Sequence, residues 1–223
     1  MNYVCRTSKP ITENFVTKLL LDRGVIINDA TYLSKFLNPT KDNEINPARL
    51  DHMEEGYKLL MDSLRNHAKI CLIVDSDCDG MTSAALFYNY LMDNFKDYEP
   101  DIVYHIPEGK EHGLDSIMDW FPEDGSNSLI VCPDSSSNDY EQHEVLAARG
   151  YSILVLDHHI TEKYSENAVV INNQLSKDYP NKDLSGVGVV YKFFEYVEMR
   201  ENLPAYSEKY IDLVALGMNE KSC

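Results

Sequence analysis

Short apolar runs alternate with amphipathic segments along most of the chain. Runs rich in Ile, Val and Leu predict buried strands at 70–74, 101–106, 129–132, 153–156 and 168–171. Apolar residues at helical spacing predict helices at 12–21, 50–64, 82–95, 140–149, 187–200 and 206–216. Strands that alternate with helices predict an α/β fold, a doubly wound parallel sheet with a short helical N-terminal extension.

The order of these elements also predicts how the chain is divided. A helical lead-in is expected over residues 1–68, where Asn-Pro pairs at 38–39 and 46–47 indicate turns. The alternating strands and helices follow over residues 69–223, which are enough for one α/β domain with its own core. We therefore expect one main domain and a small N-terminal extension.

Carboxylates and imidazoles directly follow three of the predicted strands. They are Asp75, Asp77 and Asp79 after the first strand, Asp134 after the third, and Asp157, His158 and His159 after the fourth. The carboxyl ends of parallel strands meet at one edge of a sheet, so these groups are expected to converge. Several carboxylates in one cleft need a cation to stay ionised, and adjoining imidazoles suit a transition metal such as Mn²⁺.

The carboxylates after the first strand also have a simpler interpretation. A single Asp after a strand is ordinarily a solvated loop residue or a cap, but three at alternate positions before Gly80 favour ligands. Asp77 and Asp79 are the stronger candidates, with Asp75 at the edge of the site. A haloacid-dehalogenase phosphatase would carry Thr or Val where this chain has Met81, so that alternative does not match.

Composition narrows the remaining classes. The formal net charge of −17 predicts that this chain alone holds long nucleic acid weakly. Five scattered cysteines, none in a CxxC pair, indicate neither a disulfide framework nor a zinc site. No apolar stretch is long enough to span a bilayer and the N-terminus lacks a signal-peptide pattern, so we expect a soluble, cytoplasmic protein with no membrane partner.

Four ordered motifs resemble the DHH phosphoesterases, and most closely the RecJ-type single-strand exonucleases of bacteria and their phages. They are VDSDCDGMTSAAL at 74–86, the segment around Asp134, the triplet Asp157-His158-His159, and LSGVGVVYKFFEYV at 184–197. Upstream, FLNPT at 36–40 is similar to the RecJ lead-in, and IPEGKEHGLD at 106–115 is similar to its phage-type variant. The resemblance covers nearly the whole chain.

The resemblance implies a set of roles for the site residues. Asp77, Asp79, Asp134 and His158 would hold two Mn²⁺ or Mg²⁺ ions, with Asp134 bridging them, and these residues with His159 would form the catalytic set. His159 would contact phosphate or support the ligands, while Asp157 would orient an imidazole through its second nitrogen. Further phosphate contacts would come from the turn formed by Ser185, Gly186 and Gly188, and from Lys110 and His112.

The chain departs from the RecJ pattern after DLVALG at 212–217. RecJ-type proteins continue into a turn with a further metal-binding Asp and then into a second, nucleic-acid-binding domain. Here Lys221 falls where that Asp is expected, and Glu220 lies one residue before it. We therefore expect a chain truncated after the DHH domain, with weak binding of the second ion.

The leading hypothesis is metal-dependent phosphodiester hydrolysis, as in a 5′-to-3′ single-stranded DNA exonuclease of DNA repair and recombination. One alternative is hydrolysis of short oligonucleotides or a cyclic dinucleotide. Another is a catalytically degenerate scaffold that docks a replication or repair partner. Single-stranded DNA or short oligonucleotides are the expected partners in the first two cases.

Overall fold

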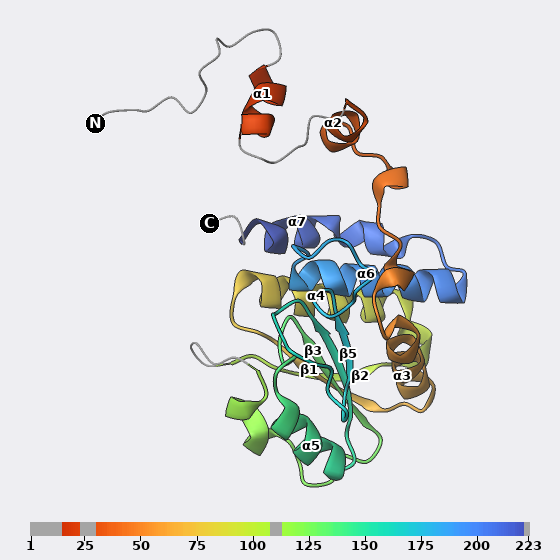
Figure 1. Cartoon of the computed structure of the whole chain (residues 1–223). Helices are drawn as coiled ribbons and strands as arrows, with labels where there is room; N and C mark the ends of the chain where they lie inside the picture. The colour runs from red at the N-terminus through yellow and green to blue at the C-terminus, as the bar shows by residue number, and fades with distance from the viewer. Residues whose placement is uncertain (1–14, 23–29, 108–112, 221–223) are drawn as a thin grey trace. The chain divides into compact units, whose positions relative to one another are not determined.

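The chain separates into two units, residues 1–45 and residues 46–223. The computed structural model describes residues 15–22, 30–107 and 113–220 (Figure 1). The first unit contains helices α1 (Phe15–Asp22) and α2 (Ala30–Leu37) and the short 3₁₀ helix η1 (Lys41–Asn43). Helix α1 overlaps the helix predicted at 12–21 and ends one residue later, while residues 12–14 lie outside the described residues. Helix α2 was not predicted from the sequence.

The second unit is built on a five-stranded, fully parallel sheet with the strand order β2-β1-β3-β4-β5. All five predicted strands are present, with ends shifted by at most one residue. Their bounds are β1 (Lys69–Ile73), β2 (Asp101–His105), β3 (Ser128–Pro133), β4 (Ser152–Asp157) and β5 (Val169–Asn172). With helices on both faces, this sheet confirms the predicted α/β, doubly wound architecture.

Helices cover both faces of the sheet. Helices α3, α4 and α6 lie against one face, with α7 next to α4 and α6, whereas α5 and η4 cover the other face (Figure 1). The α-helices are α3 (Met53–Arg65), α4 (Cys78–Asn94), α5 (Tyr140–Ala148), α6 (Gly186–Glu201) and α7 (Ile211–Glu220). The 3₁₀ helices are η2 (Pro47–Arg49), η3 (Lys96–Tyr98), η4 (Asp115–Trp120) and η5 (Tyr206–Tyr210). Among the described residues, no helix is long and apolar enough to cross a membrane.

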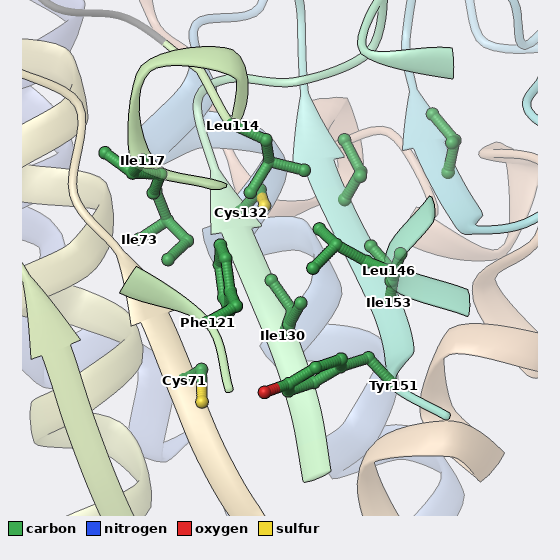
Figure 2. Close-up of a cluster of buried hydrophobic side chains, with 12 residues drawn as sticks. Cys71, Ile73, Leu114, Ile117, Phe121, Ile130, Cys132, Leu146, Tyr151 and Ile153 are labelled. Carbon is green, nitrogen blue, oxygen red and sulfur yellow. The ribbon is translucent and has the colours of Figure 1, made fainter. Parts of the chain in front are cut away.

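Burial on both faces explains why the central strands read as continuous apolar runs. Ile130 and Cys132 of β3 belong to a buried cluster with side chains from η4 and α5, such as Ile117 and Leu146 (Figure 2). Leu129 and Val131 alternate with them and are also fully buried. The sheet is therefore a rigid platform for the loops that leave its carboxyl edge.

The direction of the connections changes between β1 and β3. Strand β2 lies on one side of β1 and strand β3 on the other. The chain leaves β1 into α4 on one face and leaves β3 towards α5 on the opposite face (Figure 1). A crevice opens between two such connections, at the carboxyl ends of the strands. The loops that line this crevice carry predicted site residues such as Asp75, Asp77 and His159.

The structure divides the predicted 206–216 helix into η5 and α7, and the buried carboxylate of Glu198 explains the division. Glu198 is 5% exposed and accepts hydrogen bonds from Ser207 N (2.6 Å), Ser207 Oγ (2.9 Å) and the Tyr90 hydroxyl (3.0 Å). These bonds hold the tight 3₁₀ turn of η5 before the chain continues as α7. One buried acid thus connects α4, α6 and η5.

We predict that Glu198→Ala destabilises the fold by about 3 kcal/mol, because it leaves several buried donors unpaired. Tyr90→Phe removes a single hydrogen-bond donor and should lower the free energy of unfolding by about 1 kcal/mol. Urea unfolding followed by circular dichroism measures both values. Equal effects of the two variants would show that Glu198 does not organise this region.

Candidate metal centre

The described residues that were predicted as metal ligands or catalytic groups lie at the carboxyl ends of β1, β3 and β4. A cleft of about 580 Å³ opens there. Its walls include Asp75 and Asp77 after β1, the loop 135–138 after β3, Asp157 at the end of β4 and His159 just beyond it. The sheet topology therefore brings together groups that are separated by more than eighty residues in the sequence.

Asp77 and Asp79 are fixed by the amino ends of two helices. Asp77 caps α4, and its Oδ1 accepts a hydrogen bond from Gly80 N (2.8 Å). Asp79 is buried, and its two oxygens accept hydrogen bonds from Gly186 N (2.9 Å) and Val187 N (2.8 Å) at the start of α6. Amide donors at a helix N-terminus stabilise negative charge, so the start of α6 both orients and stabilises the Asp79 side chain.

Asp134 is buried and, among the described residues, lacks hydrogen-bond donors like those that stabilise Asp77 and Asp79. It follows β3 with left-handed backbone (φ 65°) and is 1% exposed. Neither carboxylate oxygen accepts a hydrogen bond from the described residues, although Nε2 of His158 lies 3.1 Å from Oδ1. Burial, followed by the negative charges of Asp79 and Asp157, raises the pKa of Asp134 to about 10. A positive charge beside Asp134 is needed to keep it ionised at neutral pH.

Asp157 has the opposite environment. Its Oδ1 accepts hydrogen bonds from His158 N (2.7 Å) and His159 Nδ1 (2.7 Å), and its Oδ2 accepts one from Ser137 N (3.1 Å). Burial by itself would raise the pKa of Asp157, but the hydrogen bonds, chiefly that from His159, lower it to about 2. The hydrogen bond to Asp157 in turn raises the pKa of His159. Asp157 is therefore an ionised residue that orients the His159 ring.

The donor set fits divalent cations. Asp134, Asp157, His158 and His159 each offer a ligand atom within 4.8 Å of the others, and so do Asp75, Asp77 and Asp134. Asp134 belongs to both groups, and its two oxygens have no hydrogen-bond donors among the described residues. Nε2 of His158 also lies 3.7 Å from Oδ2 of Asp79. Carboxylate oxygens with an imidazole suit Mn²⁺ and Mg²⁺.

The residues predicted to bind phosphate near the start of α6 have partners inside the chain. Ser185 caps α6, and its Oγ accepts a hydrogen bond from Gly188 N (3.4 Å), while Gly186 N donates to Asp79. Gly186 also makes room for Asp134, because a Cβ at position 186 would lie 2.0 Å from the Asp134 Oδ1. The predicted phosphate contacts Lys110 and His112 lie outside the described residues, as does Lys221.

Two residues that lie near the site, Asn172 and Gly217, were not predicted from the sequence. Asn172 ends β5, is fully buried, and donates hydrogen bonds to Ser137 Oγ and to the His159 carbonyl. Gly217 of α7 lies so close that a Cβ there would be 2.9 Å from the Asp79 Oδ1. The signal for Asn172 was a polar residue directly after an apolar run, as for the other strands. No local sequence pattern indicates that Gly217 packs against Asp79, because the two residues are far apart in the chain.

We predict that Asp134→Asn stabilises the metal-free protein. Because the folded-state pKa of Asp134 is raised from 3.8 to about 10, ionisation opposes folding as the pH rises through that window. The gain should be at least about 1 kcal/mol and larger at about pH 8 than at about pH 5. Urea unfolding in a chelator, with Asp62→Asn on the exposed side of α3 as the control, measures it. A pH-independent difference would contradict the environment described for Asp134.

Two proteins named as exonucleases have amino-acid sequences similar to that of this chain. A prophage-derived protein of Bacillus subtilis strain 168, named as the single-strand DNA-specific exonuclease YorK, is 38% identical over 182 residues, covering 82% of this chain and 30% of YorK. The single-stranded-DNA-specific exonuclease RecJ of Haemophilus influenzae is 29% identical over 229 residues, covering 95% of this chain and 38% of RecJ. The chain thus spans about a third of the length of these relatives.

Solved structures show the same fold. RecJ of Thermus thermophilus in complex with Mn²⁺ matches with a TM-score of 0.62 and 25% identity, over 75% of this chain and 24% of that one. A manganese-bound exonuclease RecJ matches with a TM-score of 0.65 and 26% identity, over 75% of this chain and 42% of that one. The family model described as the DHH family, N-terminal domain, matches residues 69–218. That match includes the strands and loops that assemble the carboxylate cleft, and the chain belongs to the DHH family.

Proposed function

We propose that this chain is a metal-dependent phosphodiesterase unit that hydrolyses single-stranded DNA from the 5′ end. The observation that carries the proposal is the position of Asp134. It is buried, its oxygens accept no hydrogen bond from the described residues, and it is shared by two groups of potential ligands. A carboxylate placed in this way is suited to lie between two cations. We assign the hydrolytic unit to residues 69–223, with residues 1–68 as the lead-in.

The residues have distinct tasks in this proposal. Asp77, Asp79, Asp134 and His158 would hold the ions, with Asp75 at the edge of the site. Bound divalent ions would lower the pKa of an attacking water and offset the charge of the phosphoryl group. The amides of Gly186 and Val187 keep Asp79 in place.

His159 would contact the phosphate. Its side chain is 51% exposed and lines the cleft, while Asp157 holds its Nδ1. The hydrogen bond to Asp157 raises the pKa of His159, which favours the protonated ring that can donate to a phosphate oxygen. Asp157 itself already accepts hydrogen bonds on both oxygens and would orient His159.

The choice of substrate rests on the relatives. YorK and RecJ are named as exonucleases specific for single-stranded DNA, and two solved RecJ structures contain manganese. Because the chain spans about a third of the length of those relatives, the activity of this chain is part of the proposal. We place the activity in the cytoplasm, in DNA repair or recombination.

Short oligonucleotides or a cyclic dinucleotide are a second candidate substrate. Among the described residues, the walls of the cleft include no Lys or Arg, and the chain carries a net charge of −17. A long strand gains most of its affinity from basic side chains along its backbone. Digestion of 5′-labelled single strands in Mn²⁺, with dinucleotides as competitors, separates the candidates. Strong inhibition by dinucleotides would favour the short substrate, and no hydrolysis of either would favour a binding scaffold.

Asp134→Ala should reduce Mn²⁺-dependent hydrolysis at least about 100-fold, because the variant loses the carboxylate shared by the two ligand groups. Cys78→Ala, between Asp77 and Asp79 at the start of α4, should retain most of the activity. Release of labelled mononucleotides measures both variants, and circular dichroism checks their folding. Equal losses in the two folded variants would contradict the assignment of Asp134.

His159→Gln should raise KM by about tenfold while leaving the affinity for Mn²⁺ within about twofold, because it removes a phosphate contact and retains the metal ligands. Initial rates over a range of single-strand concentrations give KM, and calorimetric titration gives the Mn²⁺ affinity. A loss of Mn²⁺ affinity with unchanged KM would instead make His159 a metal ligand.

A further inference from the structure

A buried amide stands beside the metal centre at the end of β5. Asn172 pairs with Asp157 in the parallel register of β4 and β5 and has no exposed surface. The loops that contain Asp134 and His158 both pass next to it.

The orientation of the Asn172 amide is determined by its neighbours. Gln174 N donates to Oδ1 of Asn172 (2.7 Å), which identifies that atom as the acceptor. Nδ2 therefore donates, to Ser137 Oγ (2.9 Å) and to the His159 carbonyl (3.0 Å). The two hydrogens of one amide group reach two different loops.

These two contacts fix loops that also depend on each other. Ser137 N donates to Asp157 Oδ2 and the His159 ring contacts Asp157 Oδ1, so Asp157 forms a second connection between the same loops. The backbone of Asp134 (φ 65°) and Ser136 (φ 74°) is left-handed. Such a conformation costs free energy in residues other than glycine and persists only where the surroundings enforce it.

We propose that Asn172 is a positioning residue of the metal centre, which holds the Asp134 loop and the His158 loop in register through its side-chain amide. The inference rests on the proposed function, since it assigns Asn172 to the same site. Asn172 contacts neither substrate nor cation in this role. Its effect reaches the site through Ser137, three residues after Asp134, and through the main chain of His159, next to His158.

A neighbouring serine provides a matched control for a purely structural role. Ser176 is also fully buried; its Oγ donates to the Asn172 carbonyl (2.7 Å) and accepts a hydrogen bond from Asp51 N (2.9 Å). These bonds connect β5 to the start of α3 and are separate from the two site loops. Ser176→Ala should thus lower stability without changing the site.

The experiment compares Mn²⁺ affinity, by calorimetric titration, in proteins shown by circular dichroism to be folded. Asn172→Ala should weaken Mn²⁺ binding by about tenfold or more, the usual effect of removing a residue that supports metal ligands. Ser137→Ala removes one of the two contacts and should give a smaller loss, and it keeps the test decisive if Asn172→Ala does not fold. Ser176→Ala should stay within about twofold of the wild type. Unchanged affinity in the folded Asn172→Ala and Ser137→Ala variants, or an equal loss in Ser176→Ala, would overturn the proposal.

A measurement without metal separates this inference from the proposed function. The exchange rate of the Ser137 amide hydrogen should rise about tenfold or more in metal-free Asn172→Ala and stay unchanged in Ser176→Ala, because only the first variant frees the loop. If the wild type binds no Mn²⁺, the proposed function fails, and hydrogen exchange alone decides whether Asn172 fixes the loops. Unchanged exchange at Ser137 in Asn172→Ala would overturn the role of Asn172 whether or not the wild type binds Mn²⁺.

Discussion

The confinement of negative charge at one edge of the sheet is the constraint on which the rest of this structure depends. Asp75, Asp79, Asp134 and Asp157 are all buried there. Helix α6 stabilises Asp79 with main-chain amides, and Asp157 is stabilised by amides and an imidazole. Asp134 receives no hydrogen bond from the described residues. The local structure thus stabilises part of the charge, and the donor set around Asp134 would suit divalent cations.

This constraint also explains the packing around the site. The start of α6 must lie close to Asp79 for its amides to donate, and Asp134 then occupies the space where position 186 would carry a side chain. The sheet makes the approach possible, because its neighbouring parallel strands β1 and β3 end at the same edge. They bring Asp79, in the first turn of α4, and Asp134 to the same His158 ring. Fold and site therefore depend on the same few contacts.

Local patterns were enough to predict the architecture, since strands buried on both faces appear as apolar runs and each is followed by its polar residues. They also predicted that the described candidates from Asp75 to His159 would converge at one edge of the sheet, where their side chains lie close together. They did not predict α2 or the division of 206–216, where a buried carboxylate of α6 sets the turn. The pairing of the Gly186 amide with Asp79 was missed for the same reason, because it joins residues 107 positions apart. Contacts between distant segments leave no periodic signal in one sequence.

The close approach of Gly186 to Asp134 has a consequence for comparing members of the family. A side chain at position 186 would overlap the carboxylate, with its Cβ 2.0 Å from Oδ1. A protein that gains any larger residue there must move either the helix or the acid, and both movements disturb the site. A glycine at the position of Gly186 together with an aspartate at the position of Asp134 is thus a criterion for sorting relatives by sequence. Relatives that have both residues are the ones in which cation binding should be measured.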